Sequence, residues 1–150
     1  MKKVSGKLKV SKKFRPCPVE EGDELYQNGI FVFNVAKMLE FINDKPNEVV
    51  LDNVDVESVR TGFPKDHLDE STIENADISK PIILAEIRPG GFNVIDGNHR
   101  LEKAYRLGRK QIGAYRFYAR QHIGFLTTEK GYVAYVQYWN EKLKSLIDRC

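Results

Sequence analysis

The chain has 150 residues, of which 41% are hydrophobic, so it is long enough for one domain with a substantial core. No uninterrupted apolar run reaches the length of a membrane span, and the polar first residues do not resemble a signal peptide. A cytoplasmic protein without a membrane partner is therefore expected. Its two cysteines exclude a zinc site built from cysteines and a disulfide framework.

The positive charge is concentrated at the start of the chain. Seven of the 24 Lys and Arg residues fall in residues 1–15, and none of the 21 acidic residues does, so the rest of the chain carries a net charge of −4. Residues 1–15 are interpreted as a basic N-terminal arm and residues 16–150 as a single domain. The arm either contacts the phosphates of DNA or of a nucleotide, or is a solvated terminus that aids solubility.

The first predicted elements are a hairpin and a helix. Residues 25–33 contain two short apolar stretches around Asn28–Gly29, a pair that favours a tight hairpin turn. Asn34 is placed to cap a helix over residues 35–43. The apolar residues expected on the inner face of this helix are Val35, Met38, Leu39 and Ile42.

A strand, a loop and a short helix are predicted next. Residues 48–56 alternate and are rich in valine, which is typical of a strand. Residues 57–66 contain a glycine and a proline and are predicted to be a loop. Asp69 is expected to cap a short helix over residues 70–75, in which Ile73 turns inward.

Two strands joined by a turn precede a helix in the middle of the chain. Residues 81–87 and 92–95 are apolar and flank a proline and two glycines, so they are predicted to pair as a hairpin. The second strand leads into a helix that begins near Asn98 and ends at Gly108, and residues 112–118 return as a strand. The inner face of the helix is expected to carry Leu101, Ala104 and Tyr105.

The rest of the sequence is predicted to be helical, with a break at residues 127–131. The last helix carries one apolar stripe, which Tyr135 and Tyr138 flank. The stripe either packs over the chain's own sheet or forms a homodimer interface, because its spacing suits both. Its members are Tyr132, Val136, Trp139, Leu143 and either Leu146 or Ile147.

The sequence Asp-Gly-Asn-His-Arg, residues 96–100, lies where an apolar strand meets a helix. A helix start has backbone N–H groups without partners and carries the positive end of the helix dipole, so it attracts anions. Gly97 allows close approach of a ligand, and Asn98 can cap the helix. Arg100 and His99 offer donors that suit phosphate oxygens. The segment predicts a phosphate site, with ordinary turn chemistry as the structural alternative.

Asp96 does not fit a bare phosphate, because two negative groups repel each other. A magnesium ion between them removes the conflict, and a carboxylate at the end of a strand is a common magnesium ligand. Alternatively, Asp96 orients His99 or pairs with Arg100. The sequence leaves both roles open. In the structural alternative, Arg100 pairs instead with Glu102 or Glu86.

Residues 78–114 resemble the core of the ParB/sulfiredoxin superfamily, in which a strand, a turn, a second strand, a DGxHR-like motif, a helix, a Leu-Gly pair and a return strand follow in this order. The resemblance implies a compact α/β (α+β) domain with a small mixed sheet and helices packed around it, to which the predicted C-terminal helix is added. It also implies that a nucleotide, ATP or CTP, binds through its phosphates at the motif helix.

The motif separates this chain from several branches of the superfamily. Sulfiredoxin-like members have a catalytic cysteine directly before the His-Arg pair, where this chain has Asn98, so sulfinic acid repair is excluded. The chromosome-partition proteins carry a Gly-Glu-Arg-Arg motif and a helix-turn-helix domain after it, and this sequence shows neither. Free serine kinases share Asp-Gly-His-His-Arg, which is matched here by Asp96, Gly97, His99 and Arg100.

The resemblance implies nucleotide-phosphate binding with magnesium-assisted hydrolysis or phosphoryl transfer. Asp96 is then the magnesium ligand and, with His99, a catalytic residue, while Thr72 and Asn75 reach the nucleotide from the facing short helix. The remaining phosphate-binding residues are Gly97, Asn98, His99 and Arg100. Two alternatives stand beside this prediction: a metal-dependent nuclease or DNA-binding module, because many stand-alone members are labelled ParB-like nuclease, and a non-catalytic regulatory or assembly module.

Overall fold

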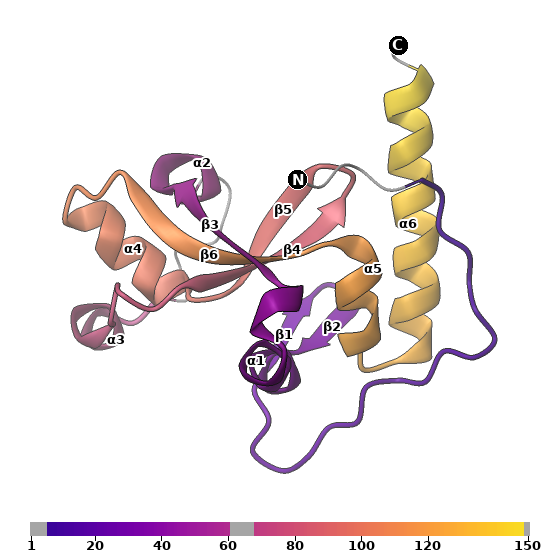
Figure 1. The fold of residues 1–150 in the computed structure, drawn as a ribbon, viewed down its shortest axis with the longest axis horizontal. Helices are drawn as coiled ribbons and strands as arrows, with labels where there is room; N and C mark the ends of the chain where they lie inside the picture. The colour runs from indigo at the N-terminus through magenta and orange to yellow at the C-terminus, as the bar shows by residue number, and fades with distance from the viewer. Residues whose placement is uncertain (1–5, 61–67, 149–150) are drawn as a thin grey trace. The chain divides into compact units, whose positions relative to one another are not determined.

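The computed structural model describes residues 6–60 and 68–148 (Figure 1). Internal contacts divide the chain into two units. The first unit comprises residues 1–48, 86–92 and 118–150, and the second comprises residues 49–85 and 93–117. The expected division into a basic arm and a single domain stays a prediction. Within the described part of the chain, no helix is long and apolar enough to cross a membrane.

The first unit begins with the predicted hairpin. β1 (Leu25–Asn28) pairs antiparallel with β2 (Phe31–Asn34). The turn lies one residue later than predicted, at Gly29–Ile30, because Asn28 is still paired with Phe31 at the end of the ladder. A tight turn with a glycine at its first position is therefore retained, shifted by one residue.

The predicted helix α1 (Val35–Asp44) follows the hairpin, and the 3-10 turn η1 (Pro46–Glu48) comes after it. Asn34 caps α1 as predicted, since its side chain accepts a hydrogen bond from the N–H of Lys37 at 3.1 Å. The prediction that Leu39 faces inward is wrong, because this side chain is 39% exposed. The apolar face of α1 is consequently narrower than expected.

The described part of the first unit also contains the helical segments α5 (Ala119–His122), η2 (Ile123–Phe125) and α6 (Glu129–Asp148). α6 begins inside the predicted break, which is shorter than expected. Tyr135 was predicted to flank the apolar stripe but is fully buried, whereas Ile147 is 63% exposed. The stripe is therefore a core feature in the first half of α6, where its buried members are Tyr132, Val136 and Trp139.

A four-stranded mixed sheet of order β3-β6-β4-β5 provides the frame of the second unit. β3 (Val50–Asp55) pairs antiparallel with β6 (Gln111–Phe117), which pairs parallel with β4 (Ile82–Arg88). β5 (Gly91–Asp96) is the neighbour of β4, as the predicted hairpin requires. Residues 86–92, at the tip of this hairpin, belong to the first unit. The mixed sheet with surrounding helices confirms the predicted α/β fold class.

Among its described residues, the second unit contains the helices α2 (Val56–Arg60), α3 (Glu70–Asn75) and α4 (Asn98–Arg106). α4 contacts both α2 and α3. α2 corrects the prediction of a loop, because residues 57–60 are helical. The rest of that predicted loop, residues 61–66, lies outside the described residues.

The core of the second unit confirms most of the predicted inner positions. Ile73 is 3% exposed, and Leu101 and Ala104 on α4 are buried. Tyr105 is the exception, because its side chain is 41% exposed and its ring lies under the Arg60 guanidinium, 3.6 Å from the ring centre. A buried α4 face over the sheet holds the end of β5 and the start of α4 in place.

Candidate functional site

The motif occupies the junction between β5 and α4. Asp96 is the last residue of β5, Gly97 is the N-cap of α4, and Asn98 is the first helical residue. Gly97 has a φ of 99°, in the left-handed region that glycine adopts without strain. A Cβ at this position would lie 2.6 Å from Cγ2 of Ile82 on β4. Close packing against a neighbouring strand thus requires this glycine, a reason that the sequence pattern does not reveal.

In the part of the chain that the structure describes, no side chain caps the start of α4. The first N–H that closes a helical hydrogen bond belongs to Leu101, which donates to the Gly97 carbonyl at 2.9 Å. The prediction that Asn98 caps the helix is wrong, because Asn98 lies inside the first turn. Its Oδ1 atom is buried and has no hydrogen-bond partner within the described residues. Among the described residues, the first turn of α4 therefore lacks a side-chain cap, and N–H groups at such a helix start can bind an anion.

Arg100 folds back toward the start of the helix. Its Nη2 donates to Oδ2 of Asp96 at 3.0 Å, and the two side chains are only 18% and 15% exposed. The same Nη2 lies 2.9 Å from where a Cβ on Gly97 would be, so the guanidinium sits beside the N-cap. Of the partners considered for Arg100, the structure selects Asp96 rather than Glu102 or Glu86. Asp96 supplies a negative charge at the positive end of α4, where the cation alone would be unfavourable.

His99 connects the starts of α3 and α4. Its Nε2 accepts a hydrogen bond from the backbone N–H of Asp69 at 3.1 Å, so we assign a neutral ring with its proton on Nδ1. Asp69 caps α3 as predicted, accepting from the N–H of Thr72 at 2.9 Å and from its hydroxyl at 2.8 Å. These hydrogen bonds, the one from the Thr72 side chain first, lower the pKa of the Asp69 carboxyl.

Thr72 and Asn75 were expected to reach a ligand from α3. Both residues are exposed, and both side chains bond within or next to their own helix. The Thr72 hydroxyl donates to Asp69, and the Asn75 amide donates to the carbonyl of Ser71 at 2.9 Å. The residue that joins α3 to the motif is Asp69, which was predicted only to be a cap.

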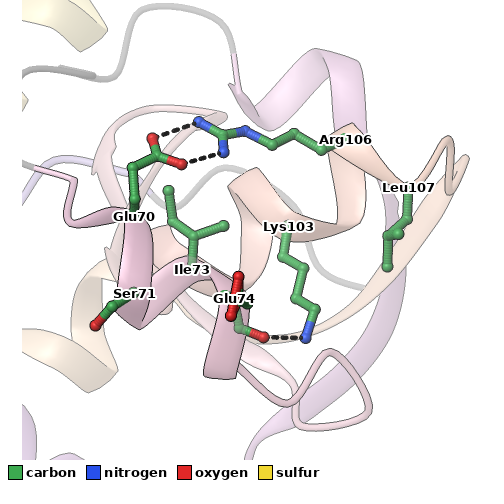
Figure 2. A pocket seen from close by; sticks show the side chains of 7 residues that line it. All are labelled: Glu70, Ser71, Ile73, Glu74, Lys103, Arg106 and Leu107. Carbon is green, nitrogen blue, oxygen red and sulfur yellow. Dashed lines mark hydrogen bonds and ion pairs between the residues drawn. The ribbon is translucent and has the colours of Figure 1, made fainter.

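A pocket lies between α3 and α4 (Figure 2). Arg106 crosses it to form a two-pronged ion pair with Glu70, at 2.7 and 3.0 Å, and Lys103 donates to the carbonyl of Glu74 at 2.8 Å (Figure 2). None of residues 96–100 lines this pocket. The full lining consists of Glu70, Ser71, Ile73, Glu74, Lys103, Arg106 and Leu107.

Glu102 is a buried acid at the centre of a network of ion pairs that the sequence analysis did not predict. It is 4% exposed and accepts from Arg60 at 2.8 Å and from Arg106 at 2.9 Å. These hydrogen bonds, the one from Arg60 first, lower the pKa of its carboxyl. Because Arg106 also binds Glu70, the network ties α2 and α3 to α4. The spacing of four between Glu102 and Arg106 was the signal available in the sequence.

A magnesium site was expected at Asp96. Across residues 6–60 and 68–148, no group of three or more His, Cys, Asp or Glu side chains is arranged to hold a metal ion. Asp96 is a single carboxylate and is already paired with Arg100. It fits magnesium only in the arrangement where nucleotide phosphates and waters supply the other ligands.

The first unit contains a separate group of buried polar side chains around Glu86, which is 2% exposed. The Glu86 carboxylate accepts from the N–H groups of Ala119 at 3.1 Å and Gly90 at 2.9 Å. Its backbone carbonyl accepts from Nε2 of His122 at 2.6 Å and from the hydroxyl of Tyr135 at 2.7 Å. Burial lowers the pKa of His122 to about 4 and raises the pKa of Tyr135. In the sequence, the position of Glu86 within the otherwise apolar strand β4 was the signal for this cluster of buried polar side chains.

A comparison with protein families matches the part of the chain that contains the junction between β5 and α4. Residues 40–122, more than half of the chain, match the family model described as the ParB N-terminal domain. No curated protein matches the chain. The matched residues include α2, α3, the whole four-stranded sheet and the junction at residues 96–100.

Proposed function

Because this chain belongs to the ParB N-terminal domain family, we propose that it binds a nucleotide through its phosphates at the start of α4. The observation that carries the proposal is the start of α4, which no described side chain caps, with the Arg100 guanidinium beside it. Open N–H groups at the positive end of a helix and a forked guanidinium are both complementary to phosphate oxygens. Asn98, with a buried acceptor oxygen that lacks a partner among the described residues, supports contact with a donor on the same ligand.

Binding of phosphate involves an exchange of partners at Arg100. Phosphate carries more charge and more acceptor oxygens than one carboxylate, so it competes with Asp96 for the guanidinium. We expect Arg100 to turn from Asp96 to the phosphate, while His99 keeps its hydrogen bond to Asp69 and presents the Nδ1 proton. The junction thereby changes from an internal ion pair to a ligand site without a change in the fold.

The activity proposed for this site is magnesium-assisted hydrolysis or phosphoryl transfer, with ATP and CTP as the nucleotides to test. Asp96, once released by Arg100, would hold a magnesium ion directly or through water, and the ion would neutralise phosphate charge. In its proposed catalytic role, neutral His99 would donate a hydrogen bond from Nδ1–H to a phosphate oxygen and stabilise the charge that develops there, since its Nε2 accepts from the N–H of Asp69. The proposal requires binding first, and binding is tested first.

Arg100→Ala is expected to weaken nucleotide binding by about 1–3 kcal/mol, because charged hydrogen bonds to the phosphates are removed. Isothermal titration calorimetry with ATP and with CTP, in the presence of magnesium, measures the change. Arg109→Ala removes an exposed arginine from the same unit and is the matched control, for which wild-type affinity is expected. Unchanged affinity of Arg100→Ala would remove this residue from the site. A wild-type protein that neither nucleotide stabilises against heat would refute the proposal itself.

The variant Asp96→Asn tests whether Asp96 is a magnesium ligand or only the ion-pair partner of Arg100. Without magnesium, the variant is expected to bind the nucleotide more tightly than the wild type, because the competing carboxylate and its repulsion of phosphate are removed. With magnesium, it is expected to lose the increase in affinity that the ion gives the wild type. Calorimetry with and without magnesium measures both effects. A magnesium response equal to that of the wild type would show that Asp96 is only the partner of Arg100.

A further inference from the structure

The basic segment at the start of the chain lies along α6 in the first unit (Figure 1). Nε1 of Trp139 donates to the carbonyl of Gly6 at 3.2 Å. The N–H and the carbonyl of Leu8 each bond to the side-chain amide of Asn140, both at 2.9 Å, and the Leu8 side chain is only 3% exposed. The beginning of the described chain is therefore anchored to the middle of α6 through its backbone.

The next residues are anchored by Tyr132, near the start of α6. The Tyr132 hydroxyl accepts from the N–H of Ser11 at 2.8 Å and donates to the carbonyl of Lys9 at 3.3 Å. The Tyr132 ring also stacks on the ring of Phe14, with 3.9 Å between the ring centres and an angle of 2° between the planes. Residues 6–15 are thus held by backbone and aromatic contacts, none of which uses a charged group of the segment.

The cations of this segment are all exposed, and we call them the basic strip: Lys7, Lys9, Lys12, Lys13 and Arg15. Within residues 6–60 and 68–148, no ion pair involves any of them. Two more cations extend the strip: the Arg120 guanidinium donates to the Lys7 carbonyl at 3.4 Å, and Lys144 lines a pocket on α6 together with Lys7. A single acid, Glu141, lines the same pocket. The strip is therefore strongly positive and held in place.

We propose that the basic strip binds the phosphate backbone of duplex nucleic acid without reading its sequence. Cations that neutralise backbone phosphates release condensed counterions, which drives binding and carries no base specificity. Because the backbone of the segment is already anchored, less conformational entropy is lost on binding than for an unanchored arm. This surface lies in the first unit and uses none of the residues proposed for nucleotide binding.

Two observations favour a duplex over other polyanions. Recognition of single strands relies on aromatic rings that stack on bases, and the ring of Phe14 is already stacked on Tyr132. Attachment to an anionic membrane combines cations with apolar side chains that insert into the bilayer. In this segment Leu8 is buried and Phe14 is stacked, which leaves Val10, 49% exposed, as its exposed large apolar side chain.

The test removes four charges of the strip together, with Lys7, Lys9, Lys12 and Lys13 each changed to Gln. The matched control removes the same net charge from exposed positions outside the strip, with Lys45, Lys80, Arg109 and Lys110 each changed to Gln. Fluorescence anisotropy with a labelled DNA duplex of arbitrary sequence is measured over a range of salt concentrations. The strip variant is expected to bind about tenfold or more weakly, and the slope of its salt dependence to fall by about 0.9 for each phosphate that it no longer neutralises. The control is expected to bind as the wild type does.

The possible results separate the proposal from its alternatives. An equal loss of affinity in both variants would assign binding to net charge alone and overturn the proposal, as would wild-type affinity in the strip variant. Vesicles that contain phosphatidylserine test the membrane alternative, and binding of the wild type to vesicles but not to DNA would also overturn it. Both variants are expected to retain the wild-type melting temperature, because none of the contacts that anchor the segment uses the substituted side chains.

Discussion

Gly97→Ala is expected to lower the free energy of unfolding by about 2–5 kcal/mol. Two effects add at this position. The backbone has a φ of 99°, which an alanine adopts only with strain, and the new Cβ would lie 2.6 Å from Cγ2 of Ile82. Urea denaturation followed by circular dichroism measures the change. Nucleotide binding is expected to weaken as well, because the shift needed to relieve the close approach moves the first turn of α4.

Gly108→Ala is the matched control for the strain alone. Gly108 also has a positive φ, 76°, but a Cβ added there meets nothing within 4 Å. We expect this variant to be destabilised by about 1–2 kcal/mol, the cost of the left-handed conformation for a residue with a Cβ. In an Ile82→Ala background, the cost of Gly97→Ala is expected to fall in part, because the nearest atom that the Cβ would meet, Cγ2 of Ile82, is gone while Nη2 of Arg100 remains. Equal destabilisation by Gly97→Ala and Gly108→Ala would contradict a role for the close approach to Ile82.

Acidification is expected to destabilise the protein through His122 by up to about 3 kcal/mol between pH 6.5 and pH 4. Burial lowers the pKa of this ring to about 4 in the folded protein, against an ordinary value of 6.5. As the pH falls below 6.5, the unfolded chain therefore binds a proton on this ring before the folded chain does. The free energy of unfolding therefore decreases as the pH is lowered from 6.5 to 4. Below about pH 4, His122 contributes no further decrease. Denaturation curves recorded across the window measure the slope.

His122→Gln is expected to flatten the slope, because glutamine does not titrate and still offers an N–H donor to the Glu86 carbonyl. The quantity to compare is the slope of the free energy of unfolding against pH, rather than the absolute stability of the variant. Carboxyl groups held below their usual pKa by hydrogen bonds reduce stability only at lower pH, from about 4.5 downward. These groups are Asp23, Asp69, Glu70, Asp77 and Glu102. A variant that keeps the wild-type slope between pH 6.5 and 4.5 would show that another group is responsible.

Local chemistry made much of the fold predictable. Asn34 and Asp69 each cap a helix because the side chain of a cap bonds an N–H only three residues further on, and sequence spacing specifies that interaction directly. The position of the junction at residues 96–100 followed in the same way from an apolar strand, a glycine and an amphipathic helix in succession. The turn of the first hairpin was misplaced by one residue because strand register depends on the pairing of both strands.

Most element types, the strand-to-helix junction and the positive charge at the start of the chain were predictable, because each depends on residues that are neighbours along the backbone, whereas the helix α2 was not predicted. The tertiary structure decided which acid pairs with Arg100, and that Asp69 meets His99 across 30 positions of sequence. It also decided that the basic strip is anchored along α6, through contacts such as that between Leu8 and Asn140, which are 132 positions apart. Such contacts depend on how distant segments pack in three dimensions, and no periodicity or spacing within one segment encodes them.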